Sequence, residues 1–221
     1  MSGPSFIFGY GSLISEDSRA RTGDSGASYP CRLSGFKRGW AYVPSHRKNT
    51  SVACWSDSTA TVNGIITEIP ATELAAFDLR EHGYKRVAVS VEQLHFIGEK
   101  LADMPDQLRQ RGASVYIYVV IDKVPFENET PLAQTYIDVI LDGCLEISED
   151  FAIEFVTTTE GWNKPYWFDD RLTLRYVRPL NYDNLPVGRI EKIDSILHEH
   201  VSHHVKRRLV ESVSLESIQS R

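Results

Sequence analysis

The feature that most constrains the fold is the stretch FIFGYGSL at residues 6–13, where an apolar run leads into a turn with two glycines and a serine. Phe6, Ile7 and Phe8 carry the aromatic and β-branched side chains that favour a β-strand. Glycine lets the backbone turn sharply and approach a ligand closely, which is typical of a binding loop. Taken alone, the stretch is more typical of an ordinary turn at the end of a strand.

Composition argues for one small domain of an enzyme. The 221 residues, 42% of them hydrophobic, can bury one sizeable core and are short for two independent domains. A net charge of −6 argues against phosphate-backbone binding, so we expect no nucleic-acid partner. Residues 1–5 lack the basic start of a signal peptide, and the apolar run after them is too short to span a membrane. We therefore expect a cytoplasmic protein with no membrane partner.

The cysteines and histidines do not indicate a disulfide framework or a metal site. Cys31, Cys54 and Cys144 are odd in number, widely spaced and without a CxxC pair, so we expect buried thiols. His200 and His204 lie four residues apart, as metal ligands on a helix can, but no acidic or cysteine partner completes a site. A hydrated helix face explains the histidines better, and no metal is expected.

Strand signals dominate the first 120 residues. After the opening strand, β-branched and aromatic runs recur at residues 31–43, 51–55, 59–69, 87–96 and 114–120. Residues 172–177 are a further candidate strand. These runs predict six or seven strands.

Three segments have helical signals. A short helix should follow Pro70, with Thr72 as its N-cap. Leu132, Tyr136, Ile140 and Cys144 recur every four residues, which predicts a helix over about 131–145 that lies against the sheet. Apolar residues at spacings of three or four over 190–209 predict an amphipathic C-terminal helix, which could also mediate a homodimer. We therefore expect one domain over residues 1–188, followed by a helix and tail over 189–221.

Several stretches resemble the gamma-glutamylcyclotransferase family at corresponding points along the chain. They are FGYGSL at 8–13, LSGFKR at 33–38, IPATEL at 69–74 with EHGYKRV at 81–87, and YIDVILDG at 136–143. The resemblance covers roughly residues 5–150, and the aromatic segment around Trp162 to Trp167 has no counterpart in the compact family pattern. It implies an α+β fold, a small mixed β-barrel with helices packed outside, and a cavity into which the first turn and a glutamate both point.

The resemblance also implies a reaction, an intramolecular cyclotransfer on a γ-glutamyl amide. The substrate's own α-amine attacks its side-chain carbonyl, giving 5-oxoproline and an amine or amino acid, with Glu81 as general acid/base. A free α-amine has a pKa of roughly 8, so it must lose a proton before it can attack at neutral pH. No cofactor and no nucleophilic side chain is required.

The remaining site residues implied by the resemblance bind the substrate. Backbone N–H groups of Gly11, Ser12 and Leu13, with the Ser12 hydroxyl, would surround an anion or a developing oxyanion. Tyr10 and Tyr136 would line the cavity and offer phenolic hydrogen bonds to the glutamyl head.

Alternatives remain open for these residues and for the function. Glu81 in isolation is typical of a solvated helix end, and Tyr136 fits core packing as well as substrate contact. The basic loop at 46–48 could meet an anionic part of the substrate, although such loops are usually just solvated. Trp162 and Trp167 could form a lip over the cavity or cap a core. The protein could instead be a non-catalytic ligand- or partner-binding module, or act on a γ-glutamyl conjugate of secondary metabolism.

Overall fold

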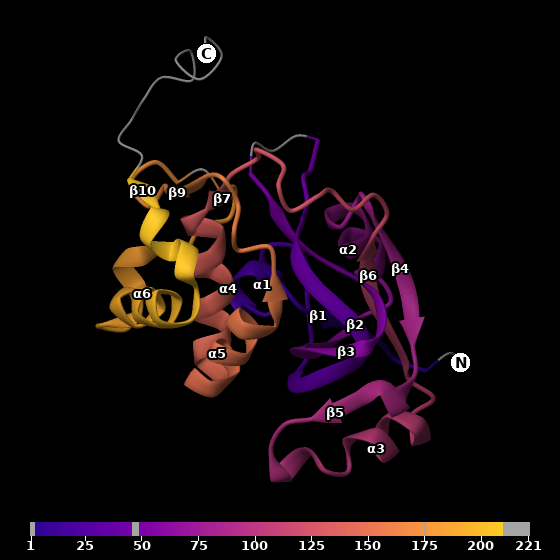
Figure 1. Cartoon of the computed structure of the whole chain (residues 1–221). Helices are drawn as coiled ribbons and strands as arrows, with labels where there is room; N and C mark the ends of the chain where they lie inside the picture. Colours follow the sequence, from indigo (N-terminus) through magenta and orange to yellow (C-terminus); the bar gives the residue numbers. More distant parts are fainter. Residues whose placement is uncertain (1–2, 46–48, 175, 210–221) are drawn as a thin grey trace.

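A seven-stranded sheet forms the centre of the computed structural model, which describes residues 3–45, 49–174 and 176–209 (Figure 1). The strand order is β4-β6-β1-β3-β2-β5. In addition, β8 pairs in parallel with Arg38 and Gly39 of β2. The strands are β1 (Ser5–Gly9), β2 (Ser28–Tyr42), β3 (Ser51–Ile69), β4 (Tyr84–Val89), β5 (Leu94–Phe96), β6 (Ser114–Val120) and β8 (Thr159–Glu160). Together with the helices, this sheet confirms the predicted α+β class.

The opening strand β1 lies in the middle of the sheet. It pairs antiparallel with β3 and parallel with β6, so that Phe8 stands beside both Ile66 and Ile117. Phe6 and Phe8 are buried on one face and Ile7 on the other. Burial on both faces explains why the run is apolar at every position rather than at alternate ones.

The helices lie around the sheet. They are α1 (Glu16–Ala20), α2 (Leu74–Arg80), α3 (Met104–Gln110), α4 (Gln134–Ile147), α5 (Glu149–Thr158) and α6 (Arg189–His200). Figure 1 shows α4, α5 and α6 gathered on one side, whereas α2 lies beside β4 and β6. Short 3-10 turns in the described part of the chain are η1 (Val91–Gln93), η2 (Glu99–Leu101), η3 (Tyr182–Asn184) and η4 (Ser202–Lys206).

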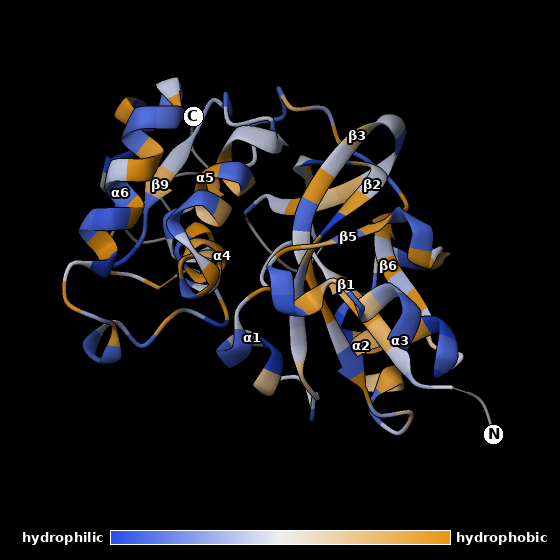
Figure 2. Ribbon diagram, turned by 90° about the horizontal axis from the view of Figure 1, so that it is seen from below, coloured by the Kyte–Doolittle hydropathy of each residue, from blue (hydrophilic) through white to orange (hydrophobic). Residues whose placement is uncertain are grey.

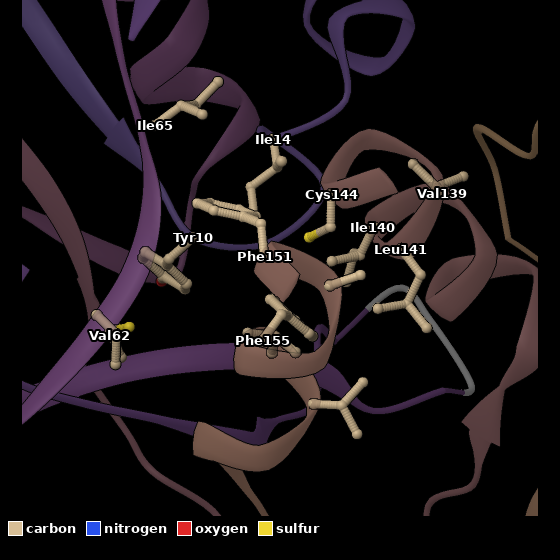
Figure 3. Close-up of a cluster of buried hydrophobic side chains, with 14 of the residues drawn as sticks. Tyr10, Ile14, Val62, Ile65, Val139, Ile140, Leu141, Cys144, Phe151 and Phe155 are labelled. Atoms are coloured by element: carbon tan, nitrogen blue, oxygen red, sulfur yellow. The ribbon is translucent and has the colours of Figure 1, made fainter. Parts of the chain in front are cut away.

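The main core lies between the sheet and α4 with α5. The predicted stripe of α4 is confirmed, since Tyr136, Ile140 and Cys144 are all buried. In Figure 3, Ile140 and Cys144 of α4 lie close to Ile14 of the first turn and Phe151 of α5. Figure 2 shows apolar residues concentrated on α4 and the strands, whereas α6 alternates between hydrophobic and hydrophilic residues. All three cysteines are buried, as expected.

Arg38 on β2 is a charged group inside this core. Its guanidinium donates to both the carbonyl and the side-chain oxygen of Asn63, at 2.7 and 2.8 Å, and to the hydroxyls of Thr158 and Thr159. It also lies 3.8 Å from the ring centre of Phe155. Burial lowers the pKa of Arg38 to about 10. These bonds join β2, β3 and α5 through one side chain.

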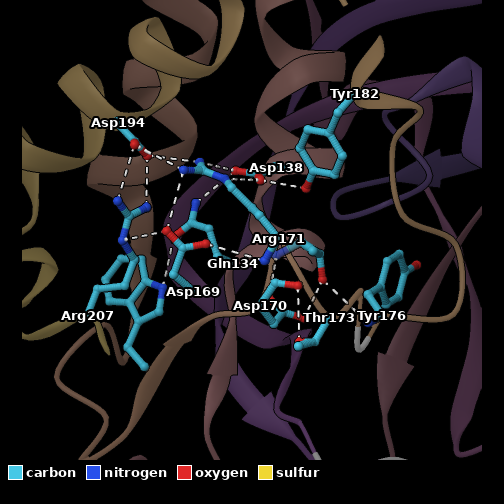
Figure 4. Close-up of polar contacts among 12 residues, drawn as sticks. Gln134, Asp138, Asp169, Asp170, Arg171, Thr173, Tyr176, Tyr182, Asp194 and Arg207 are labelled. Carbon is cyan, nitrogen blue, oxygen red and sulfur yellow. Dashed lines mark hydrogen bonds and ion pairs between the residues drawn. The ribbon is translucent and has the colours of Figure 1, made fainter. Parts of the chain in front are cut away.

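A second, smaller sheet attaches the last third of the chain to α4. It consists of β7 (Leu132–Ala133), β9 (Trp167–Asp169) and β10 (Arg208–Leu209). Beside it, Arg171 forms paired contacts with Asp138 of α4, at 2.7 and 2.8 Å, and with Asp194 of α6, at 2.9 and 3.0 Å (Figure 4). Arg207 reaches the same Asp194 at 2.8 Å. This charge network fixes α6 and the chain after it to α4.

The sheet differs from the expected barrel because it stays open. Across the described residues, its order begins at β4 and ends at β5, with no ladder between these two strands. The chain passes from one to the other through η1, a 3-10 turn closed by a capping box of Ser90 and Gln93. Instead, β4 pairs with β6 and β5 pairs with β2, so the two strands lie at opposite ends of the sheet.

Two predicted helix boundaries are wrong. The helix α2 begins at Leu74 after Glu73, not after Thr72, because the N–H of Glu73 is taken up by a turn to the carbonyl of Pro70. The C-terminal helix ends at His200, because Val201 adopts an extended conformation and η4 follows. The apolar spacing continues through Val205, yet that side chain is exposed.

The candidate strand at 172–177 is also wrong for the positions that the structure describes. The carbonyl of Asp170 accepts from the N–H groups of both Thr173 and Leu174, which forms a tight turn instead. Leu172 and Val177 are exposed. Within the described residues, no helix is both long and apolar enough to cross a membrane.

Candidate active site

Two adjoining pockets lie where β1 ends, and four residues line both of them. The inner pocket encloses about 320 Å³ and the outer pocket about 400 Å³, each counted with space open to solvent. The shared residues are Ser12, Glu81, Tyr84 and Tyr136. The inner pocket is completed by Tyr10, Gly11, Leu13, Val52 and Tyr118, and the outer pocket by Tyr42, Pro44, Ser51, Arg80, His82, Tyr176 and Arg178. All six predicted site residues therefore line the inner pocket.

The first turn is shaped by a close approach at Gly9. A Cβ atom there would lie 2.7 Å from the Cβ of Leu13, so only glycine lets Leu13 fold back over the end of β1. The N–H of Ile14 donates to the carbonyl of Gly11 at 2.9 Å and closes the turn. The buried Arg19 then donates to the carbonyls of Leu13 and Ile14, at 2.7 and 2.8 Å. The carbonyls after the turn are thus satisfied inside the protein.

The backbone N–H groups of the turn remain available. Among the described residues, no hydrogen bond uses the N–H of Gly11, Ser12 or Leu13. Successive unused N–H groups beside a cavity can bind an anion. The turn therefore combines backbone donors with the Ser12 hydroxyl at the wall of the inner pocket.

Glu81 lies at the C-terminal end of α2 and reaches both pockets. Its N–H donates to the carbonyl of Phe77 at 3.0 Å, which fixes the backbone. Its Oε1 lies 3.0 Å from Nε of Arg80, and their side chains are 17% and 4% exposed. The carboxylate is therefore largely shielded, oriented by a buried guanidinium, and accessible from the cavity.

Arg80 connects Glu81 to the first turn. Its Nη2 donates to the hydroxyls of Ser12, at 3.1 Å, and Ser18, at 3.0 Å. Its Nη1 donates to the carbonyl of Ser18 at 2.8 Å and to the hydroxyl of Thr22. Because the Ser12 oxygen accepts from Arg80, its proton is free to point toward a ligand. No motif marks Arg80 in the sequence, and only its position beside Glu81 could have pointed to it.

Three tyrosines of the inner pocket already donate their hydroxyl protons within the protein. Tyr10 donates to the carbonyl of Tyr118 at 2.7 Å, and Tyr84 to the carbonyl of Val52 at 2.9 Å. Tyr118 donates to Asp78 Oδ1 at 2.7 Å. Burial raises the pKa of all three phenols well above the ordinary value, so they are neutral at physiological pH. Tyr10 can thus accept a hydrogen bond from a ligand but has no spare proton to donate.

Tyr136 combines the two roles left open for it. Its ring packs on Tyr176, with centres 4.7 Å apart, and edge-on against Trp40 at 5.8 Å. Its hydroxyl points toward the first turn, because a Cβ atom at Gly11 would lie 3.5 Å from it. Tyr136 is therefore both a core residue and part of the cavity wall.

Two roles are predicted for the aromatic segment after residue 160, a lip over the cavity or a cap on a core. Trp162 and Trp167 stack at 5.6 Å, and Trp162 packs on Trp40 at 5.0 Å. Neither lines the two pockets, which favours the interpretation that they cap a core. Tyr176 and Arg178, which follow them, line the outer pocket instead. The basic loop at 46–48 lies outside the described residues.

No family model matches the chain, and no curated protein matches its sequence. Among solved structures, it is similar to one named "Gamma-glutamyl cyclotransferase", at 15% identity over 66% of this chain and 85% of that one, with a TM-score of 0.48. An uncharacterized protein from Homo sapiens has 15% identity, 68% and 87% coverage, and a TM-score of 0.49. A yeast gamma-glutamyl cyclotransferase specific to glutathione has 14% identity, 89% and 90% coverage, and a TM-score of 0.43.

Two of these three structures are named as gamma-glutamyl cyclotransferases. At such identities the likeness concerns the fold, and a shared fold fixes neither substrate nor activity.

Proposed function

We propose that the protein is a gamma-glutamylcyclotransferase-like enzyme that converts a γ-glutamyl amide into 5-oxoproline and a free amine or amino acid. The observation that carries this proposal is that one pocket contains both the Glu81 carboxylate and the first turn, whose N–H groups make no hydrogen bond to any residue that the structure describes. A cyclisation of this kind needs a base for the α-amine and donors for the carbonyl oxygen, and needs no nucleophile from the protein.

In the proposed reaction, Glu81 removes a proton from the α-ammonium group of the substrate. The amine nitrogen then attacks the side-chain carbonyl carbon, and the carbonyl oxygen gains negative charge. Glu81 then gives its proton to the leaving nitrogen as the original amide bond breaks and the oxyanion returns to a carbonyl. The ring nitrogen still carries one proton too many, and Glu81 passes this second proton to the released amine, which leaves as an ammonium ion beside neutral 5-oxoproline. The same carboxyl group acts first as base and then as acid, so no net proton is consumed.

The first turn stabilises the developing oxyanion in this scheme. Backbone N–H groups are held in place before the reaction starts, so they need not reorganise as the charge forms. Arg80 holds the Ser12 hydroxyl and the Glu81 carboxylate through different nitrogens, which fixes the oxyanion donors relative to the base. Since nucleophile and carbonyl belong to one molecule, binding it in a bent conformation lowers the barrier by several kcal/mol, roughly the scale of effective-molarity effects.

The test is release of 5-oxoproline from γ-glutamyl dipeptides, γ-glutamylamines and glutathione by wild-type protein and by Glu81→Gln. We expect turnover of at least one substrate class, and a fall in kcat of about 100-fold or more for Glu81→Gln with binding affinity kept within a few-fold. Glu99→Gln makes the same chemical change at an exposed site and serves as the matched control.

Two outcomes would contradict the proposal. One is that no γ-glutamyl compound releases 5-oxoproline, with Glu81→Gln binding these compounds as the wild type does; the protein would then be a binding module. The other is a Glu81→Gln variant that retains most of the wild-type rate, because the base would then be another group.

A further inference from the structure

Three phenols of the inner pocket can only accept a hydrogen bond from a bound molecule. Tyr10, Tyr84 and Tyr118 line this pocket, and each donates its proton to an oxygen of the protein, at 2.7, 2.9 and 2.7 Å. A phenol has one proton to donate, so what remains for a ligand is a lone pair. The ionised carboxylate of Glu81, in the same pocket, is also an acceptor. These four side chains, called the acceptor wall below, suit a ligand group with several N–H donors.

Tyr118 differs from the other two phenols because a side chain, rather than a backbone carbonyl, takes its proton. Asp78 Oδ1 accepts it at 2.7 Å, and Oδ2 of the same carboxylate lies 3.3 Å from Nη1 of Arg86. Arg86 on β4 is the strand partner of Tyr118 on β6, and α2, which carries Asp78, lies beside both strands (Figure 1). A hydrogen bond to a carboxylate is stronger than one to a neutral oxygen. The contact with Asp78 therefore determines which way the Tyr118 proton points.

The two kinds of hydrogen-bonding group in the inner pocket belong to different parts of the chain. The first turn contributes backbone N–H groups and the Ser12 hydroxyl, which suit a carbonyl oxygen or an anion. The acceptor wall suits the opposite chemistry. In a γ-glutamyl amide, the group with several N–H donors is the α-ammonium, which carries three and a positive charge. This separation of donors from acceptors favours one orientation of the glutamyl group.

We propose that Tyr118 binds the α-ammonium group of the substrate beside Glu81, and that Asp78 is a positioning residue that keeps the Tyr118 proton out of the pocket. The inference rests on the proposed function, which supplies the ligand. If the proton turned into the pocket, an O–H donor would face the ammonium and the two would repel each other. Arg86 supports this arrangement because it contacts the second oxygen of Asp78.

The inference predicts an effect of Asp78→Asn, although Asp78 lines neither pocket. Arg86 can only donate, so it attracts the amide oxygen of the new side chain and turns the amide NH2 group toward Tyr118. Tyr118 then accepts that hydrogen bond, and its own proton turns into the pocket. Asp78→Asn should therefore weaken ammonium binding more than Tyr118→Phe, which only removes an acceptor. In the double variant the hydroxyl is absent, so the result should match Tyr118→Phe alone.

The test measures ligand binding by isothermal titration calorimetry in Glu81→Gln as the parent protein, in which the proposed reaction is suppressed. The probes are γ-glutamyl-alanine and glutaryl-alanine, which lacks only the α-amino group, so the ratio of their Kd values gives the preference for the ammonium. We expect the parent to bind γ-glutamyl-alanine at least ten-fold more tightly. Tyr118→Phe should lower this preference about 3- to 10-fold and Asp78→Asn at least three-fold further, the scale of one hydrogen bond to a charged group.

The matched control is Asp106→Asn, which makes the same chemical change at an exposed carboxylate. Asp106 also contacts an arginine, Arg109, at 2.7 Å, and it lines neither pocket. We expect this variant to leave the preference unchanged. Asp78→Asn itself carries little risk to folding, because the side chain of Asp78 is 43% exposed and asparagine has the same shape.

The outcomes separate this inference from the reaction itself. If the parent does not bind γ-glutamyl-alanine more tightly than glutaryl-alanine, the acceptor wall does not recognise the ammonium. Equal losses in Tyr118→Phe and Asp78→Asn, or losses that add up in the double variant, would show that Asp78 does not direct the Tyr118 proton. Release of 5-oxoproline by the wild type tests the cyclotransfer separately. A protein with the predicted preference but no such release keeps the ammonium site and loses the proposed function.

Discussion

The Nε atom of Arg80 lies 3.0 Å from Oε1 of Glu81, while the same guanidinium donates to the hydroxyl of Ser12. One buried side chain thus determines the distance between the two halves of the candidate site, the turn after β1 and the carboxylate after α2. Planar guanidinium groups suit this task because their donors point in fixed directions. Arg80 is a positioning residue in the proposed reaction rather than one that touches the substrate's reacting atoms.

Replacement of Arg80 by alanine should impair both activity and stability. We expect kcat/KM for 5-oxoproline release to fall about 10- to 100-fold, because small displacements of catalytic groups have effects of this size. The free energy of unfolding should drop by about 1–3 kcal/mol, since the carbonyl of Ser18 and the hydroxyl of Thr22 lose their donor. Steady-state kinetics and urea denaturation measure the two effects.

The control for Arg80→Ala is Arg32→Ala, which removes an exposed arginine that pairs with Glu154. We expect this change to alter stability by less than about 1 kcal/mol and to leave kcat/KM unchanged. Arg80→Lys, which retains the charge but not the planar group, should show an intermediate loss of activity. A folded Arg80→Ala variant with wild-type kinetics would show that Arg80 does not position the site.

Alanine in place of Gly9 or Gly11 should have two different effects, the first on stability and the second on substrate binding. At Gly9 a Cβ atom would lie 2.7 Å from the Cβ of Leu13, so Gly9→Ala must displace the turn and should lower stability by about 1–3 kcal/mol. At Gly11 the nearest atoms lie at 3.5 Å or more, namely the hydroxyl of Tyr136 and the side chain of Val52. We expect Gly11→Ala to fold normally and to raise KM, because its methyl group enters the inner pocket.

Thermal unfolding and steady-state kinetics of the two variants form one experiment, with each variant as the control for the other. Unchanged stability in Gly9→Ala would contradict the close packing of Leu13 over the end of β1. An unchanged KM in Gly11→Ala would show that the substrate does not occupy the space next to Tyr136.

Local sequence patterns predict those parts of the fold and site that depend on neighbouring residues. The buried strand before Gly9 and the helix that carries Tyr136 follow from runs and spacings of apolar side chains. Their packing could be anticipated because burial dictates those patterns. The same patterns overextend the C-terminal helix, since apolar spacing continues through Val205 although the backbone becomes extended at Val201.

The missed site residues depend on pairings between distant segments. Tyr118 enters the inner pocket because β6 pairs with β1, a contact between Ser5 and Ser114 that no local pattern specifies. Arg178 enters the outer pocket because a turn at Asp170 replaces the strand expected there. A sequence read one segment at a time can therefore identify the motifs of this site but not the wall around them.

The charge network around Arg171 should contribute strongly to stability. Its partner Asp138 has a side chain that is 0% exposed, so removal of the guanidinium leaves a buried carboxylate without its cation. We expect Arg171→Met to lower the free energy of unfolding by about 3–5 kcal/mol in urea denaturation. The double variant Arg171→Met with Asp138→Leu should recover part of this loss, because the buried charge is also removed.

Lys192→Ala is the control for a pair at the surface, since Lys192 meets Glu149 at 2.8 Å with both side chains about half exposed. We expect this variant to lower the free energy of unfolding by less than about 1 kcal/mol. Equal effects of Arg171→Met and Lys192→Ala would contradict the view that the Arg171 network holds α6 on α4.

His204 should make the fold sensitive to mild acid. Burial, together with the nearby Arg207, lowers the pKa of His204 to about 4, whereas a histidine in the unfolded chain titrates near 6.5. Between these values the unfolded chain binds a proton that the folded chain does not, so stability is complete above about pH 6.5 and falls as the pH drops to about 4. The difference between these two pKa values corresponds to roughly 3 kcal/mol of folding free energy.

His204→Phe removes this titration and keeps a ring that can pack edge-on against Trp167, which lies 5.3 Å from the imidazole. We expect the stability of the variant, relative to wild type, to rise by about 2–3 kcal/mol between pH 7 and pH 4, because only the wild type loses this contribution. Urea denaturation at several pH values measures the change, and His95→Phe shows the effect of losing an exposed imidazole. Parallel pH profiles for His204→Phe and wild type would show that His204 is not held in its neutral form.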